Sequence, residues 1–483
     1  MAEGTDRAGH RVANDIARRI IHIGWPIGQH LGTEAALLTE LGVGRSTFRE
    51  GISILKRQGI VRSEAGPRGG LVIEAPPGTA LSNLLRNYLE LADVSFQELM
   101  LVHRILAHVA ADLALARVTP ARLNDLRAAL RMPMPGRASR DDQGMLITGF
   151  EGAMLRLADN PDLEHVTLAL HRLLADFGHQ ERYPKALWSD TLARNFEINE
   201  QMLSALVARD PALHDIIDKR YGYVLSLVAE LEGRNARIWN RRSFLHGAYT
   251  SAFVGRESSQ RAPLRVSYEL AAEIRRKELA PGTRLGNELE IARRHGASRV
   301  VTIEALRMLE FLGIVRVLRG RSVGVEVIAP DPTLVIQTAA LYLEYLDGLP
   351  TDLHILRRGL ERGLIEAASD HLCDSRISPL AARAAAFDHI PFDERCLKAA
   401  ALYRDLIALA NNRAATFLAE ILERVHRKRR SAGASSSVHI VEAGKALQIA
   451  LSSPDGLDVP TRIMELLIAV DEFSSEQDID IHQ

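Results

Sequence analysis

The chain has 483 residues, of which 47% are hydrophobic and 25% are charged, and its formal net charge is -1. This length exceeds what one hydrophobic core usually supports, so several domains are expected. Two cysteines exclude a disulfide framework and a cysteine-based zinc site, and the sequence shows neither an export signal nor an apolar run of about 18 residues. The many Ala, Leu and Arg residues and the 5% aromatic content predict a mainly helical protein. The cysteine count and the lack of an export signal or apolar run predict that it is cytoplasmic and has no membrane span.

The first 76 residues pass from helical to strand periodicity. A first helix is predicted over 12–23, where "GWPIG" ends it, a second over about 33–41 and a third over about 46–57. After the third helix the period becomes two, which predicts that "IVRSE" and "LVIEA" are strands on either side of the turn "AGPRGG". Three helices followed by a hairpin are the order of a winged helix-turn-helix.

Basic side chains gather at the start of the third predicted helix and on the hairpin turn. In a winged helix-turn-helix the start of that helix enters the DNA major groove, where Arg pairs with guanine and Ser or Thr bonds bases or phosphates. Residues 41–70 contain six Lys or Arg and two acids, a local charge of +4 that the overall charge conceals. The predicted DNA contacts are Arg45, Ser46, Thr47, Arg49, Arg68 and Gly69. Double-stranded DNA is therefore the expected partner.

The chain repeats itself at an interval of 254 residues. Residues 12–76 align with 266–330 without a gap, and 19 of the 65 positions are identical. The triplet "YLE" recurs in the same register at 88–90 and 342–344, so the repeat extends past the small N-terminal module. A period this long indicates duplicated domains and not a solenoid of short repeats. We expect two tandem copies, each with a winged helix followed by a long helical region.

The second copy has a more apolar recognition helix than the first. Val300 and Val301 take the places of the first copy's Ser and Thr, and Ile303 takes the place of its second Arg. The predicted DNA contacts of this copy are Arg299, Arg319 and Arg321. Two alternatives stay open: this copy grips phosphates without reading bases, or its apolar residues are buried against another domain or protomer. Weakened or lost base reading is favoured in either case.

Both copies resemble the N-terminal domain of GntR-superfamily transcription regulators. The segments "GVGRSTFREGI" and "HGASRVVTIEAL" fit the family pattern of the third helix, and a Gly-rich wing follows the first of them. The resemblance implies that Arg45 and Arg49 are the two recognition-helix arginines. It also implies that Thr47 is the polar residue between them and Gly69 the wing glycine. One departure is Ala35, which stands where the family has an Arg after the second-helix Glu.

The helical regions, 81–240 and 335–470, resemble the C-terminal domain of the FadR-like subfamily. In "LHILRRGLERGLIEAAS", Arg357 and Glu361 lie one helical turn apart on an otherwise apolar helix. The resemblance implies an all-helical domain that binds a small carboxylate, often through a metal held by Asp and three His, or an acyl thioester. At or near the ligand positions this chain has Ile147, Glu151, Asn199 and Tyr221 in the first copy and Ala399, Tyr403 and Gly444 in the second. We therefore predict no metal and no cofactor, and an effector pocket that relies on Arg and Tyr.

The predicted fold is mainly α, with two winged helix-turn-helix domains that are each followed by an all-helical effector-type bundle. The expected boundaries are 8–78 for the first winged helix, 79–245 for its helical domain, 246–263 for a linker, 264–331 for the second winged helix, 332–472 for its helical domain, and 473–483 for an acidic tail. Either the two copies form a pseudo-dimer within one chain, or two chains form a homodimer.

These patterns predict a DNA-binding transcription regulator whose affinity for DNA responds to a small carboxylate or acyl effector in the helical domains. The alternative is a non-catalytic regulatory scaffold that keeps the winged-helix folds for contacts with proteins. An enzyme is not expected, because the sequence has no phosphate-binding Gly loop, nucleophile elbow or catalytic triad arrangement.

Overall fold

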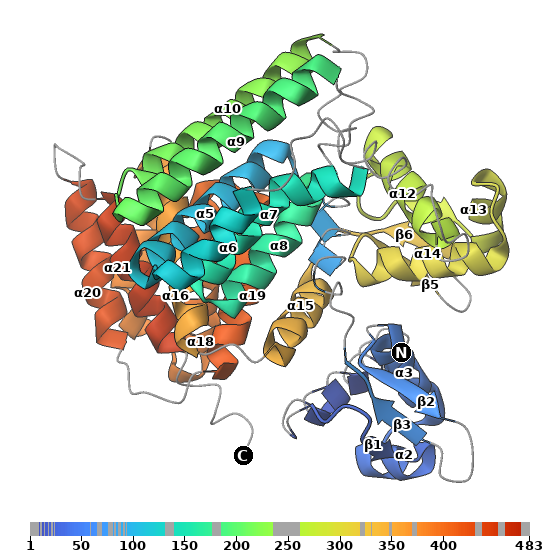
Figure 1. Ribbon diagram of the computed structural model, residues 1–483. Coiled ribbons are helices and arrows are strands. Elements are labelled where there is room, and N and C mark those ends of the chain that lie inside the picture. The colour runs from blue at the N-terminus through green and yellow to red at the C-terminus, as the bar shows by residue number, and fades with distance from the viewer. Residues whose placement is uncertain are drawn as a thin grey trace. The chain divides into compact units, whose positions relative to one another are not determined.

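The computed structural model (Figure 1) describes most of the chain. The described segments, apart from isolated residues within them, are 9–64, 70–75, 81–130, 140–175, 185–234, 261–318, 324–346, 350–369, 374–429, 437–452 and 459–474. Contacts within the chain divide it into two units, one of residues 1–91 and 255–347 and the other of 92–254 and 348–483. Each unit therefore combines sequence from both halves of the chain.

The first unit contains a winged helix near the N-terminus. Its elements are β1 (His30–Gly32), α2 (Glu34–Leu41), α3 (Arg45–Arg57), β2 (Val61–Glu64) and β3 (Gly70–Ile73). They confirm the second and third predicted helices and the hairpin. The strand β1 was not predicted; it pairs antiparallel with β3 and completes a sheet of order β1-β3-β2. Because β1 and β3 approach closely, a Cβ on Gly70 would overlap the Gly32 carbonyl oxygen, so this base of the wing requires glycine.

A second winged helix in the same unit has the same order of elements from its first strand onward, and a helix precedes that strand. They are α12 (Arg261–Arg276), β4 (Arg284–Gly286), α13 (Glu288–Arg294), α14 (Arg299–Phe311), β5 (Val315–Leu318) and β6 (Gly324–Val327). The sheet order is β4-β6-β5, which matches the first sheet strand for strand. The helix α12 includes the last three residues of the expected linker, most of which lies outside the described residues.

The helix α15 (Thr333–Tyr345) follows the second winged helix but packs against the first one. Leu341 belongs to the hydrophobic core of the N-terminal winged helix, and Tyr345 packs at its edge. The rings of Tyr345 and Trp25 lie 4.8 Å apart between centroids, and the Trp25 indole N–H donates to the carbonyl of Glu74. Burial of this apolar face explains why α15 joins the first unit, although its sequence reads as the start of a helical domain.

The second unit is all helical among the described residues. From the first half of the chain it contains α5 (Phe96–Arg117), α6 (Pro120–Leu130), α7 (Arg140–Ala158), α8 (Pro161–Ala175), α9 (Lys185–Ala208) and α10 (Leu213–Arg234). From the second half it contains α16 (Pro350–Ala368), α17 (Asp374–Ala385), α18 (Phe392–Ile407), α19 (Arg413–Arg429), α20 (Ser437–Leu451) and α21 (Val459–Ser474). The helices α9 and α10 form a long hairpin (Figure 1). The mainly α fold with two winged helices is confirmed.

In the part of the chain that the structure describes, one helix, α5, is long and apolar enough to cross a membrane by length and composition alone. Its most apolar stretch is 67% buried inside the second unit, as in the core helix of a folded bundle. A capping box at its start, in which Ser95 and Glu98 bond each other's backbone amides, fixes where this core helix begins.

The two halves of the second unit exchange equivalent hydrogen bonds. Asn160, which precedes α8, donates from Nδ2 to the carbonyl of Asp352 at 2.9 Å. Asn412, which precedes α19, donates in the same way to the carbonyl of Glu98, also at 2.9 Å. The 254-residue shift places the acceptor Glu98 on Asp352, and the two donors correspond because each directly precedes its helix, so each half makes with the other the bond that it receives. This reciprocity is the pattern of a twofold axis.

An ion pair beside one of these bonds predicts a pH-dependent stability. Glu98 lies 2.9 Å from the Arg413 guanidinium of the other half. Burial alone would raise the pKa of Glu98, but hydrogen bonds from Arg413 and from Ser95 lower it from 4.5 to about 2. Because the folded-state pKa is lowered, this carboxylate stabilises the fold above about pH 4.5, and the contribution is lost as the pH falls towards 2.

We therefore expect Glu98→Gln to destabilise the protein at pH 7 by about 1 kcal/mol, since Arg413 is solvent-exposed and the pair is screened. The deficit should shrink towards pH 3, and thermal unfolding at the two pH values measures it. The exposed carboxylate of Asp125, changed to Asn, serves as the control. A Glu98→Gln deficit of equal size at both pH values contradicts the assignment.

Candidate nucleic-acid interface

The start of α3 presents polar side chains on a fixed support. The apolar face of the helix, which begins at Phe48, is buried in the core of the first winged helix. This burial sets the rotation of α3 and leaves Arg45, Ser46 and Arg49 exposed, whereas Thr47 is half-buried. The structure therefore brings the four predicted recognition-helix residues together on the first turns of one helix.

Arg49 is held by an acid on the neighbouring helix. Its Nε lies 3.3 Å from Oε1 of Glu34, in the first turn of α2, and its side chain stays 71% exposed. A guanidinium has five N–H donors, so one such bond leaves donors for a phosphate or a base edge. Among the described residues, Arg45 makes no ion pair or side-chain hydrogen bond. One arginine is therefore oriented in advance, and the other is unrestrained.

The second winged helix pairs its acid with a different arginine. Glu288, the equivalent of Glu34, lies 3.3 Å from Nε of Arg299 at the start of α14. Val300 follows it and is 69% exposed, while Val301 and Ile303 are half-buried. The surface beside Arg299 is thus apolar, and it lacks the two hydroxyl groups and the second guanidinium that the first winged helix has at the equivalent positions.

The tips of both wings lie outside the described residues. This applies to the predicted contacts Arg68, Gly69, Arg319 and Arg321. The bases of the wings are described, and there Arg62 is paired with Glu64 and with Glu74, the latter at 3.3 Å. Part of the local positive charge of the first module is therefore neutralised beside its own sheet, and within the described part of this module the cations of α3 form an exposed basic group.

Comparison with known sequences gives a family for both winged helices. Residues 8–72 and 264–325 match the family described as "Bacterial regulatory proteins, gntR family". Each winged helix thus contains a segment that matches this family model, and these two modules are referred to as the GntR domains.

A 127-residue stretch of the chain is 30% identical to a protein of Mycobacterium tuberculosis described as "Uncharacterized HTH-type transcriptional regulator Rv0494". The match covers 26% of this chain and 52% of that protein, so the chain spans about half the length of this relative. A solved Streptococcus agalactiae GntR covers 45% of this chain and 98% of its own, at 18% identity and a TM-score of 0.27. A structure titled "Lar controls the expression of the Listeria monocytogenes agr system and mediates virulence" covers 46% and 97%, at 16% identity and a TM-score of 0.19.

Sequence reasoning missed the role of the acid at the start of the second helix in both GntR domains. Glu34 and Glu288 occupy equivalent positions, but they pair with arginines at different positions of their recognition helices. In the first domain this is Arg49, and in the second, where Ile303 replaces that residue, it is Arg299. A Glu at this position of a sequence that also has a basic third helix is the signal that could have predicted the pair.

Beyond the GntR domains, the first half of the helical unit contains a buried polar cluster. The Tyr221 hydroxyl is hydrogen bonded to Nδ1 of His103, whose Nε2 lies 3.2 Å from Oε1 of Glu151. An ionised Glu151 assigns the ring proton to Nε2, so Nδ1 accepts from the tyrosine. Arg220 reaches the same carboxylate at 3.4 Å. Burial, and then the charge of Glu151, raises the pKa of Tyr221 well above its ordinary value.

The second half has a different buried cluster at the equivalent place. Glu361 accepts from Arg357 Nε at 2.9 Å, from Arg358 at 2.6 Å and from the Tyr403 hydroxyl at 2.7 Å. The Arg357 guanidinium also lies 5.0 Å from the centre of the Tyr403 ring. The 254-residue shift places Arg357 on His103, so the two halves build unlike polar cores from equivalent positions.

The metal that the FadR-like resemblance implies does not fit these residues. Glu151 is engaged by His103 and Arg220, and the Tyr221 hydroxyl is bound to the same imidazole. At the position of Gly444, a Cβ would lie 2.5 Å from the backbone of α17, so a ligating side chain has no room there. Among the described residues no group of three or more His, Cys, Asp or Glu is arranged to hold a metal ion.

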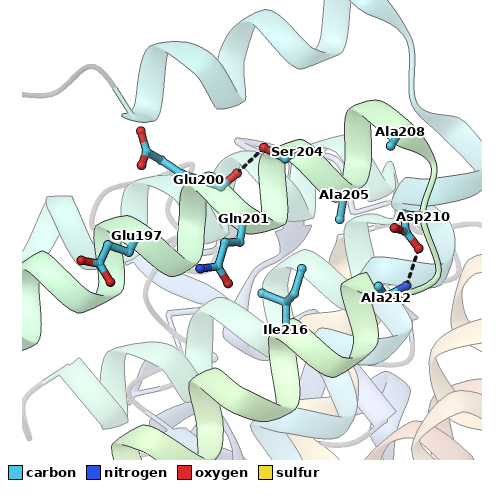
Figure 2. A pocket seen from close by; sticks show the side chains of 9 residues that line it. All are labelled: Glu197, Glu200, Gln201, Ser204, Ala205, Ala208, Asp210, Ala212 and Ile216. Carbon is cyan, nitrogen blue, oxygen red and sulfur yellow. Dashed lines mark hydrogen bonds between the residues drawn. The ribbon is translucent and has the colours of Figure 1, made fainter.

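A surface pocket of about 600 Å³ lies between α9 and α10 (Figure 2). It carries the carboxylates of Glu197, Glu200 and Asp210, and Glu197 is paired with Arg194 at 2.9 Å. Figure 2 shows that the Asp210 carboxylate accepts the Ala212 amide, an internal bond of the turn. An acidic rim repels a carboxylate ligand, so this pocket does not match the effector that the sequence predicts.

Proposed function

We propose that this protein is a DNA-binding transcription regulator. The observation that carries the proposal is the pair Arg45 and Arg49, exposed on the first turns of α3 in a GntR-family domain whose core fixes that helix. An arginine in this position reaches base edges when the helix enters the major groove. The name of the Mycobacterium tuberculosis relative, a transcriptional regulator, supports the same function. A non-catalytic, cytoplasmic protein is part of this proposal.

The chain is, in this proposal, a tandem duplication of a winged helix and a FadR-like helical domain. The two sheets with the same strand order and the reciprocal bonds of Asn160 and Asn412 support it. The proposed boundaries of these domains are the ones expected from the sequence: 8–78, 79–245, 264–331 and 332–472. The first GntR domain reads bases, and the second, with Arg299 beside exposed Val300, contributes phosphate contacts or a protein contact.

A small carboxylate or acyl effector in the helical unit modulates the affinity for DNA in this proposal. The cluster in the first half supports such a site, since Arg220 is the cation that a carboxylate would pair with and Glu151 is the group it would displace. The effector acts by favouring one of two arrangements of the GntR domains that differ in affinity for DNA.

Selection of binding sites from random DNA with the full-length protein, at a stated salt concentration, tests the proposal. We expect an asymmetric DNA motif in which one half-site is strongly specified, because the two recognition helices differ. A symmetric palindrome would instead show that two chains pair their first domains or that Arg299 still reads bases. No enriched motif would favour the alternative of a scaffold that binds proteins. Unchanged DNA affinity in the presence of short mono- and dicarboxylates would count against the effector part alone.

A further inference from the structure

The helices α5 and α16 pack through a seam in which glycines face branched side chains. The seam consists of Ile105 and Val109 on α5 and Gly359 and Gly363 on α16. A Cβ built on Gly363 would lie 2.5 Å from Cγ2 of Ile105, and one built on Gly359 would overlap the Val109 side chain. Cβ atoms essentially never come closer than about 3 Å to another heavy atom, so both positions of α16 require glycine at this helix separation.

The four residues of the seam come from only two equivalent positions. The shift of 254 residues that aligns the winged helices places Ile105 on Gly359 and Val109 on Gly363. It also places the first residue of α5 on the first residue of α16. Each contact crosses between the positions, because Ile105 meets Gly363 and Val109 meets Gly359. The pairing therefore follows the same pseudo-twofold relation as the Asn160 and Asn412 bonds. The seam itself is asymmetric, because both branched side chains come from α5 and both glycines come from α16.

We infer that the seam is heterotypic, so that the first helical half fits the second half and not a copy of itself. Two α5 helices in this geometry would put Ile105 against Val109 twice, where the helix separation has no room even for a Cβ. Two α16 helices would put glycine against glycine twice and leave the volume of two side chains, those of Ile105 and Val109, empty. Only the mixed pair fills the seam without overlap.

The inference commits this face of α5 to one occupant, the α16 face of the same protein. Two chains therefore do not join through their first helical halves, and every helical pair contains one half of each kind. This excludes the homotypic pair through which two first GntR domains would be presented together. The inference rests on the packing of the helical unit alone, so it does not depend on whether the protein binds DNA.

Exchanging the branched residues of α5 with the glycines of α16 in the full-length protein tests the inference. The double variant Gly359→Ile/Gly363→Val gives α16 the residues of α5 and imitates the homotypic pair. We expect a fall in the thermal unfolding midpoint of about 4 °C or more, because the seam becomes overpacked. The converse variant, Ile105→Gly/Val109→Gly, empties the seam and should also lower the midpoint. The quadruple variant that combines all four changes restores complementarity and should recover more than half of each loss.

A matched control separates packing from helix propensity. Gly222 in the exposed part of α10 has no heavy atom within 4 Å of its would-be Cβ, so Gly222→Val should leave the midpoint unchanged or raise it. If α5 and α16 did not pack through the seam, Gly359→Ile/Gly363→Val would raise the midpoint for the same reason. That sign, or a quadruple variant with the summed losses of the two doubles, would overturn the inference.

Discussion

The double variant Arg45→Ala/Arg49→Ala is expected to lose about 100-fold or more in affinity for a selected DNA site. Each arginine that pairs with a base edge discriminates by about 1–3 kcal/mol, and the two side chains share the exposed first turns of α3. Because both side chains are exposed, the variant should fold normally, and the ion pair lost with Arg49 costs at most about 1 kcal/mol. Titration of labelled DNA with each protein, at several salt concentrations, measures the loss.

The salt dependence of the same titrations separates base contacts from phosphate contacts. Affinity for DNA falls as the salt concentration rises. Removal of a cation that only contacts phosphate should make the plot of log affinity against log salt less steep by about 0.9, whereas removal of a base contact should leave its steepness nearly unchanged. Arg299→Ala is the matched change at the equivalent position of the second GntR domain. It should make the salt dependence less steep and change the preferred DNA sequence little. Equal losses of preference in the two variants would contradict the assigned division between the domains.

The winged helices were predictable from sequence because their determinants are local. Alternating and helical periodicities fix α2, α3 and the hairpin, and each depends on neighbours within a few residues. The strand β1 was missed since it has only three residues, including Gly32, and exists through its pairing with β3, about 40 residues away. The ion pair of Glu34 with Arg49 was missed for a similar reason, because it joins two helices.

Long-range packing explains what the sequence could not predict in the rest of the chain. The helix α15 has the periodicity of any apolar helix, and only its contacts with Trp25 and with the core of the N-terminal winged helix show that it belongs to the first unit. Arg357 and Glu361 were recognisable as neighbours on one helix turn, but Tyr403 comes from α18 and has no local signal that links it to them. The glycines of α16 likewise acquire a reason only opposite α5. The predicted effector pocket and wing contacts remain predictions.

Glu361→Ala is expected to destabilise the protein by about 3–5 kcal/mol, the largest effect of a single change in the helical unit. The carboxylate accepts hydrogen bonds from Arg357, Arg358 and Tyr403, and both Arg357 and Glu361 are almost completely buried. Removing it takes away the carboxylate that pairs with the buried Arg357 guanidinium, and breaking a buried ion pair from one side costs far more than the pair itself contributes. Denaturant unfolding, monitored by circular dichroism, gives the change in free energy.

Two further variants decide whether the loss comes from the unpaired charge. The exposed Glu366 lies on the same helix, and Glu366→Ala should change stability by no more than about 0.5 kcal/mol. Replacing the cluster together, with Arg357→Met, Glu361→Leu and Tyr403→Phe, should restore most of the stability, since apolar residues of similar volume remove the uncompensated charge. If the triple variant were as unstable as Glu361→Ala, the cluster would act through its specific hydrogen bonds. In that case its geometry, and not its charge balance, would be what holds α16 against α18.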